Sequence, residues 1–241
     1  MAGGKKTRRG SAPRVEIHES RYGRELIVDG TFASLYRPGE ITTGSVWDAI
    51  AAPALALPPE KRRRFLILGL AAGSAARVLR ALAPGAEIVG VEIDRDVLEV
   101  ARDQFELDAL DVEIIRDDAL AVLDRERRKF DAIFDDVFIG HGDSVHKPAW
   151  LPDPAHATAR ARLRSGGLLV SNTLDEAPNV ARSLAEAHES VVQIEIDGYD
   201  NRVLTGGPKG LSARGLRRAI AASDVLHATL PELRVRTLSR R

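Results

Sequence analysis

The chain has 241 residues, with 35 Lys and Arg, 35 Asp and Glu, and no cysteine. A formal net charge of zero gives no overall attraction to nucleic acid or to an anionic membrane, and the lack of cysteine excludes disulfides, thiol catalysis and thiolate zinc sites. The sequence shows no signal-peptide pattern and no apolar run of membrane-spanning length. We therefore expect a soluble, cytoplasmic protein without nucleic-acid or membrane partners.

The N-terminal part differs in composition from the rest. Residues 1–13 place basic side chains among glycine and serine, so we expect a disordered tail, with a nucleic-acid-binding arm as the alternative. Residues 14–42 contain short β-rich runs on either side of Asp29-Gly30, a strong hairpin signal, and predict a small N-terminal β-hairpin module. Apolar residues at helical spacing then predict a helix within 43–57, with a threonine or serine as its cap.

The stretch 65–94 has the pattern strand, glycine turn, helix, strand. Residues 65–68 are a short apolar run typical of a buried parallel strand, and residues 69–74 form a turn of small residues. Helical spacing then continues from residue 75, and residues 88–91 are β-rich. The pattern predicts one unit of a parallel α/β sheet.

This unit indicates a nucleoside site. Small residues in the turn would let the backbone and the helix N-terminus approach a ligand closely. They are Gly69, Ala71, Ala72 and Gly73. Glu92, at the end of the next strand, is placed to accept hydrogen bonds from ribose hydroxyls. The fingerprint G-x-G-x-x-G is absent, which argues against a dinucleotide. The alternative is that the glycines serve only the turn.

Two later strands, 112–116 and 130–136, also end in carboxylates. These are Asp117, Asp118, Asp135 and Asp136. Ligands of open α/β sheets bind beyond the carboxyl ends of the strands, so Glu92, Asp118 and Asp136 are expected on one rim. The alternative is that these acids cap the following helices, which suits Asp117 or Asp118 best.

Residues 137–152 form a long loop where lids often occur. Its His141 and His146 are candidate bases or substrate contacts, with exposed loop histidines as the alternative. No residues have metal-ligand spacing, so we expect no metal site. The remaining pattern predicts helices at 154–163, 179–188 and 212–222, strands at 168–174, 191–197 and 201–207, and a frayed basic C-terminal tail at 234–241.

Together these motifs resemble the spermidine synthase family, the polyamine aminopropyltransferases, over residues 22–208. The matching segments are YGRELIVDG, LILGLAAGSAARVL, VEID, RDDA, FDAIFDD and LRSGGLLVSN. The resemblance implies an α/β, Rossmann-like fold of the class I S-adenosylmethionine-dependent methyltransferases. We expect a mostly parallel seven-stranded sheet with helices on both faces in a domain at 43–233, after the hairpin module. A homodimer is also implied.

The resemblance assigns roles to several residues. S-adenosylmethionine, or its decarboxylated form, would be the cofactor. Its ribose side would be bound by Glu92 and Asp94, its adenine side by Asp117, Asp118 and Ala119, and Asp136 would be catalytic.

Departures from the family pattern concern the substrate. The family's aspartate that holds the amine end of the decarboxylated cofactor is replaced by Ala72, and a second aspartate that contacts the polyamine is replaced by Ile139. Residues 36–50 also lack the family's Tyr-Gln/His-Glu cluster. Candidate substrate contacts are Tyr36, Trp47, Asp135, His141 and His146, and a core role is the alternative for Trp47.

Three hypotheses follow. The first is methyl transfer from intact S-adenosylmethionine to a small molecule, with Asp136 as base or orienting group; Ala72 would not repel the cofactor carboxylate. The second is aminopropyl transfer to a polyamine, with Asp135, Asp143 or Asp153 as a substitute in the amine site. The third is a non-catalytic nucleoside-binding or scaffold protein that keeps the fold.

Overall fold

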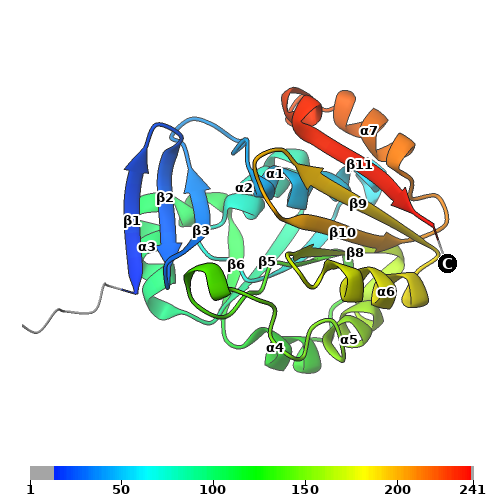
Figure 1. The fold of residues 1–241 in the computed structure, drawn as a ribbon, viewed down its shortest axis with the longest axis horizontal. Helices are drawn as coiled ribbons and strands as arrows, with labels where there is room; N and C mark the ends of the chain where they lie inside the picture. Colours follow the sequence, from blue (N-terminus) through cyan, green and yellow to red (C-terminus); the bar gives the residue numbers. More distant parts are fainter. Residues whose placement is uncertain (1–13, 240–241) are drawn as a thin grey trace, which may run out of the picture.

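The computed structural model describes residues 14–239, which form a small antiparallel sheet beside a larger sheet (Figure 1). The small sheet contains β1 (Val15–Ser20), β2 (Gly23–Val28) and β3 (Thr31–Tyr36) in that order. Asp29 and Gly30 join β2 to β3, and both have positive φ angles, 49° and 73°, as a two-residue hairpin turn of this type requires. The predicted hairpin is confirmed, and β1 adds a third strand. The predicted tail at 1–13 lies outside the described residues.

Within the described residues, the larger sheet has eight strands in the order β11-β9-β10-β8-β7-β4-β5-β6. They are β4 (Arg64–Leu68), β5 (Glu87–Glu92), β6 (Val112–Arg116), β7 (Phe130–Asp135), β8 (Leu163–Thr173), β9 (Ser190–Ile196), β10 (Arg202–Gly207) and β11 (Leu233–Leu238). Strands β4 to β8 are parallel, and β9 to β11 pair antiparallel. The chain moves from β4 to β5 and β6 on one side, then to β7 and β8 on the other. The strand order therefore reverses between β4 and β7.

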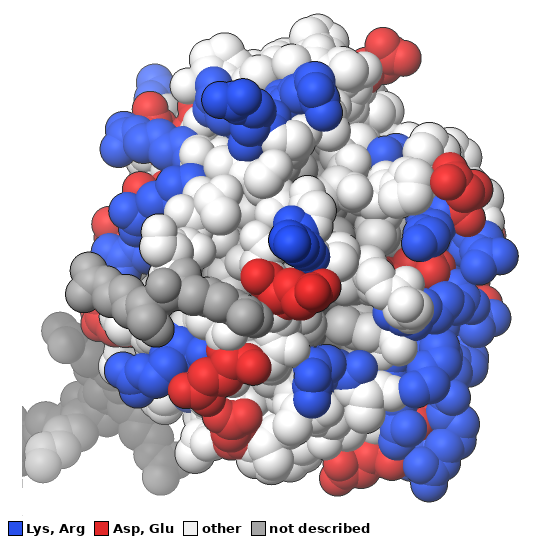
Figure 2. Space-filling view, turned by 90° about the vertical axis from the view of Figure 1, so that its right-hand side faces the viewer, with Lys and Arg blue, Asp and Glu red and all other residues white. Residues whose placement is uncertain are grey.

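The prediction of seven strands is wrong, and so is the prediction of fraying from Arg234, because residues 234–238 belong to the edge strand β11. Residues 240–241 of the predicted tail lie outside the described residues. Arg234 pairs with Asp197 at 2.6 Å and Arg236 with Glu195 at 3.3 Å. The basic residues that suggested a tail are thus ion-pair partners of the neighbouring strand and its turn. Figure 2 shows the face of the molecule that includes β11, with acidic side chains lying beside basic ones.

Helices cover both faces of the larger sheet (Figure 1). They are α1 (Val46–Ala51), α2 (Ser74–Leu82), α3 (Arg95–Phe105), α4 (Ala119–Arg125), α5 (Ala155–Ala161), α6 (Ala177–Ala187) and α7 (Ala213–Ala221). Side chains of β4 alternate between the two faces: Phe65 and Ile67 pack with α1, α2, α3 and α7, whereas Leu66 and Leu68 pack with α4, α5 and α6. The predicted α/β fold with both faces covered is confirmed. No helix within residues 14–239 is long and apolar enough to cross a membrane.

The helix predicted within 43–57 is shorter than its apolar spacing indicated. It begins at Val46 and tightens into a 3-10 helix at Ala52–Ala56, where Pro53 cannot donate a helical hydrogen bond. Ser45 is the N-cap residue but makes no side-chain cap bond; instead the Asp48 carboxylate accepts from the N–H of Thr43 at 2.8 Å.

Candidate active site

A cavity of about 600 Å³ opens at the carboxyl ends of β4, β5 and β7, where the strand order reverses. This is the position at which open parallel sheets bind ligands, and the volume suits a small molecule. Of the residues selected from the sequence, those that line the cavity are Trp47, Gly69, Ala71, Glu92, Asp94, Asp117, Asp118, Ala119 and Asp136. The structure therefore brings the acids of three successive strand ends to one cavity.

The turn after β4 lies against the end of β7. Gly69 has a φ of 80°, and a Cβ atom here would lie 2.5 Å from the carbonyl oxygen of Asp136. Only glycine combines this backbone conformation with such a close approach. Ala71 follows with a φ of 45°, and its N–H donates to Glu92 Oε2 at 2.9 Å. The turn is thereby fixed between the ends of β5 and β7.

Glu92 ends β5 and is half-buried in the cavity wall. Its Oε1 accepts from the N–H of Asp94 at 3.0 Å, and Oε2 accepts from Ala71. Burial raises the pKa of Glu92, and these backbone hydrogen bonds oppose the rise. A carboxylate oxygen has two acceptor sites, so the group can still accept hydrogen bonds from ligand hydroxyls.

Three further acids border the cavity while serving the protein's own structure. Asp94 caps α3 by accepting from the first backbone N–H groups of that helix. Asp118 caps α4 by accepting from the N–H of Ala121 at 3.0 Å, so the capping alternative is confirmed for this residue. The hydrogen bond from Arg125 lowers the pKa of Asp117. Both oxygens of Asp94 and Asp117 already have partners, whereas the cap bond of Asp118 uses only its Oδ1.

Ala72 and Gly73 do not line the cavity, although the sequence grouped them with the cofactor-binding turn. The N–H of Ala72 donates to Ser34 Oγ on β3 at 3.0 Å, and Ala72 is 2% exposed. Gly73 is the N-cap of α2, and a Cβ atom here would lie 2.8 Å from the Leu107 side chain. The turn bends away from the cavity after Ala71, so these two residues contact β3 and the segment after α3.

Asp136 lies directly after β7 and faces the cavity. Its Oδ1 accepts a hydrogen bond from Asn172 Nδ2 at 2.7 Å, and Asn172 Oδ1 accepts from Asn201 Nδ2 at 3.0 Å. Burial raises the pKa of Asp136 to about 6, against the opposing effects of Asn172 and of the Trp47 indole. A carboxylate with this pKa is mostly ionised at neutral pH and remains basic enough to accept a proton.

Asp135 is turned away from the cavity and belongs to a buried charge cluster. Lys147 Nζ lies 2.8 Å from its Oδ1, while Ser171 Oγ at 2.7 Å and His156 Nε2 at 3.3 Å contact its Oδ2. Burial alone would raise the pKa of Asp135, but Lys147 and His156 outweigh it and hold the pKa well below its usual range. Asp135 is thus a fully bonded structural acid and does not line the cavity.

The loop after β7 borders the cavity and reaches the small sheet. Ile139 and His146 exchange two backbone hydrogen bonds of 2.8 Å, and the N–H of Gly142 donates to the carbonyl of Asp29 at 2.9 Å. His141 and His146 are exposed and do not line the cavity. The alternative of exposed loop histidines is therefore confirmed for both residues.

The two aromatic residues proposed as substrate contacts have different environments. Tyr36 is buried against Phe105, with the Arg77 guanidinium 4.5 Å from the centre of its ring, and it does not line the cavity. Trp47 lines the cavity and packs edge-to-face on Phe32, with ring centroids 5.0 Å apart.

Sequence reasoning missed several neutral residues of the cavity. They are Phe32, Phe138, Trp150, Asn172, Tyr199 and Asn201. Asn172 had a usable signal, because it lies near the carboxyl end of the predicted strand 168–174. Tyr199 and Asn201 had none, since they reach the cavity only through the turn between antiparallel strands β9 and β10.

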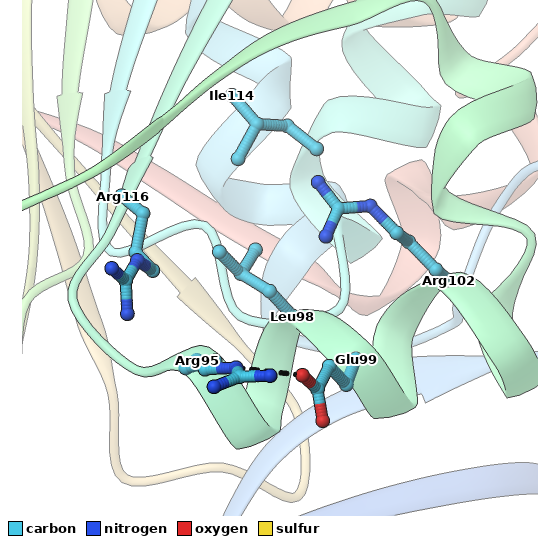
Figure 3. A pocket seen from close by; sticks show the side chains of 6 residues that line it. All are labelled: Arg95, Leu98, Glu99, Arg102, Ile114 and Arg116. Atoms are coloured by element: carbon cyan, nitrogen blue, oxygen red, sulfur yellow. Dashed lines mark hydrogen bonds and ion pairs between the residues drawn. The ribbon is translucent and has the colours of Figure 1, made fainter.

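A second hollow, of about 330 Å³, lies between α3 and the edge strand β6 (Figure 3). Arg95, Arg102 and Arg116 surround it, and Arg95 pairs with Glu99 at 2.7 Å. Exposed ion pairs of this kind contribute little to stability, and Glu99, the acid that lines the hollow, is held in this pair with Arg95. Within residues 14–239, no group of three His, Asp or Glu residues could hold a metal ion. The cavity at the strand ends is therefore the candidate active site.

Comparison with known proteins supports this position. A family described as Methyltransferase domain matches residues 65–167. A probable polyamine aminopropyl transferase of Bifidobacterium longum is 33% identical over 132 residues, which cover 54% of this chain and 28% of that protein. The chain thus matches just over a quarter of the length of this curated relative.

Solved structures are similar over more of the chain. A probable spermidine synthase from Corynebacterium glutamicum has a TM-score of 0.68 at 20% identity and covers 92% of this chain and 86% of its own. Human methyltransferase-like protein 13 in complex with SAH has a TM-score of 0.60 at 24% identity, covering 78% and 93%.

The sheet order, the covering helices and these matches define a chain with the class I S-adenosylmethionine-dependent methyltransferase fold. The chain is also similar in sequence and structure to spermidine synthase-like proteins, so the resemblance found in the sequence is confirmed.

Proposed function

We propose that the protein is a transferase that uses S-adenosylmethionine to methylate a small molecule, with Asp136 as base or orienting group. The observation that carries this proposal is that Glu92 and Asp136 face one cavity from the ends of β5 and β7, on either side of the Gly69 turn.

The residues on the β5 side fit the nucleoside part of this cofactor. Gly69 and Ala71 offer a closely approaching backbone, and Glu92 offers free acceptor sites for the two ribose hydroxyls. Ile93 lines the cavity next to Glu92 and is 65% exposed, so its apolar side chain is accessible to a ligand. We assign Ile93 to the face of the adenine ring, with Asp118 at the ring edge.

The residues on the β7 side fit the chemistry. The cofactor, when bound, supplies an electrophilic methyl group. Asp136 would accept the proton of the acceptor's hydroxyl or amine, while Asn172 holds its other oxygen and fixes the carboxylate plane. A pKa of about 6 matches a base that works near neutral pH.

Aminopropyl transfer remains the second candidate, because the matched Bifidobacterium longum protein bears that description. Several observations favour methyl transfer. Position 139 carries isoleucine, and none of the substitutes Asp135, Asp143 and Asp153 lines the cavity. A polyamine dication would therefore bury an ammonium without a partner carboxylate, which costs several kcal/mol by order of magnitude. The third candidate, a non-catalytic binding protein, is disfavoured by the exposure of Asp136 to the cavity.

Calorimetric titration with S-adenosylmethionine and with its decarboxylated form tests the proposal. Tighter binding of the intact cofactor is expected, preference for the decarboxylated form would support aminopropyl transfer, and binding of neither would support a non-catalytic role.

Turnover tests the role of Asp136. Asp136→Asn should lower kcat by about 10²–10⁴-fold while cofactor binding is unchanged. The rate is that of S-adenosylhomocysteine release with the best acceptor from a panel of small hydroxyl and amine compounds. Asp153→Asn is the matched control, because Asp153 is exposed and lies outside the cavity. Equal kcat for parent and Asp136→Asn would remove the assigned role.

We also propose a homodimer on the basis of the resemblance alone. Sedimentation equilibrium of the full chain checks it, and a monomer at all concentrations would contradict it.

A further inference from the structure

The cavity has two chemically different halves. Its β5 side carries Glu92 and the capping acids, and Asp29 lies near this side because it pairs with Arg14, which also pairs with Asp94. The side formed by β3, α1, the loop after β7 and the β9–β10 turn is aromatic. Its aromatic residues are Phe32, Trp47, Phe138, Trp150 and Tyr199. They include both tryptophans of a chain with only 5% aromatic residues, so this enrichment points to a ligand with a flat apolar surface.

The polar groups of the aromatic half are few and connected. Asp136 is the carboxylate at the strand end of this half, and the amides of Asn172 and Asn201 stand behind it; Asp29, at the border of the two halves, pairs with Arg14. Asn172 is 3% exposed, and because its oxygen accepts from Asn201, its nitrogen donates to Asp136. In this series of hydrogen bonds from Asn201 through Asn172, Asp136 accepts through Oδ1. The Trp47 indole also hydrogen-bonds the Asp136 carboxylate. Each carboxylate oxygen has two acceptor sites, so Asp136 can still accept a hydrogen bond from a ligand hydroxyl.

A cation is already present beside the aromatic half. The Lys147 ammonium lies 4.4 Å from the centroid of the Phe138 ring and pairs with Asp135 behind it. It occupies the cation–π position on Phe138 and adds positive charge near Asp136. A polyamine brings two ammonium groups, and only one of them could pair with Asp136. The other would meet this positive charge without a partner carboxylate, whereas a neutral ring would not.

We infer that the acceptor is a neutral, hydroxylated aromatic small molecule, a phenol or catechol, whose ring lies among these aromatic side chains and whose hydroxyl donates to Asp136. This inference rests on the proposed methyl transfer and names its substrate class.

The chemistry balances without a further reactant. The acceptor hydroxyl gives its proton to Asp136, and its oxygen forms a bond to the methyl carbon of S-adenosylmethionine. The carbon–sulfur bond breaks, and its electron pair stays on sulfur. The products are an aryl methyl ether and S-adenosylhomocysteine, and Asp136 later returns the proton to solvent.

Binding measurements test the inference without using activity. Both tryptophans line the cavity, so their fluorescence reports an acceptor directly. The full chain, saturated with S-adenosylhomocysteine, is titrated with catechol, with its saturated analogue cyclohexane-1,2-diol and with putrescine, and calorimetry gives each Kd. Catechol should bind at least tenfold more tightly than either of the others.

Variants locate the effect. Phe138→Leu should weaken catechol binding several-fold and leave cyclohexane-1,2-diol unchanged, since an aromatic partner is lost while apolar volume is kept. Tyr22→Leu is the matched control, because Tyr22 is 55% exposed and lies outside the cavity. Equal Kd values for catechol and cyclohexane-1,2-diol, or tighter binding of putrescine, would overturn the inference.

The titration is repeated without nucleoside. Failure to bind S-adenosylhomocysteine would overturn the proposed function, and the comparison of catechol with cyclohexane-1,2-diol would still decide whether the aromatic half selects aromatic ligands.

Discussion

Asp135 and Asp136 are consecutive in the chain but belong to two regions with opposite electrostatics. In the buried charge cluster, Asp135 is held by Lys147, His156 and Ser171, and its pKa lies well below the usual range. In the cavity, Asp136 accepts from Asn172, and its pKa is raised to about 6. Successive side chains of a strand point to opposite faces, which separates the two acids.

The difference distinguishes a structural acid from a candidate catalytic acid. A buried charge that serves the fold needs its acceptor sites filled by donors, as those of Asp135 are. A group that acts on a ligand must keep an acceptor site free and must be desolvated enough to bind a proton, as Asp136 is. The acid with more hydrogen-bond and ion-pair partners, Asp135, therefore has the lower pKa, and the acid with fewer, Asp136, has the higher one. Variants of the partners of either acid can test this relation.

The largest change in stability is expected on the Asp135 side. Lys147→Met leaves the buried Asp135 carboxylate without its counter-charge and should cost about 3–5 kcal/mol of unfolding free energy, measured by urea unfolding at pH 7. Asp135→Asn combined with Lys147→Met removes both charges and should recover most of the loss. Lys209→Met, at an exposed lysine, is the control and should change stability by less than about 0.5 kcal/mol. A similar small change for Lys147→Met would show that the cluster is not structural.

Much of the fold could be predicted from the sequence. The strands at 65–68, 112–116 and 130–136 are short apolar or β-rich runs bounded by turns and followed by helical spacing, so local pattern and tertiary structure agree. Strand β11 was missed because an exposed edge strand rich in arginine shows little apolar pattern. Its pairing with β9 is a contact between distant parts of the chain, which local sequence does not reveal.

The site residues that could be predicted are those whose position is set by the carboxyl end of a parallel strand. Glu92 and Asp136 follow strands, and parallel strands bring their carboxyl ends to one edge. The sequence could not decide which member of Asp135-Asp136 faces the cavity, because the donors of Asp135 come from the loop, α5 and β8. It also could not show that the turn bends away before Ala72 or that the β9–β10 turn contributes Asn201.

The pH dependence of stability tests the Asp136 side. Burial raises its folded-state pKa from 3.8 to about 6, so the folded protein holds a proton that the unfolded chain releases. The contribution to stability is fully present below about pH 4 and is lost as the pH rises through about 6. Asp136→Asn lacks this titrating group. Its free energy of unfolding should therefore equal that of the parent near pH 4 and exceed it by about 2 kcal/mol at pH 7, allowing for the partial exposure of Asp136. Urea unfolding of both proteins at the two pH values measures the difference, and a constant difference would contradict the raised pKa.

The smallest effects, of about 1–2 kcal/mol or less, separate the two regions at adjacent residues of β8. Ser171→Ala removes a buried hydrogen bond to Asp135, so it should lower the unfolding free energy by about 1–2 kcal/mol and leave the pH profile of kcat unchanged. Asn172→Ala removes the hydrogen bond that lowers the pKa of Asp136, so it should move the acidic limb of that profile to higher pH. If Asn172 were merely structural, Asn172→Ala would lower the stability of the protein but leave the pH profile of kcat unchanged. A profile shifted by Ser171→Ala and not by Asn172→Ala would reverse the assignment of the two acids.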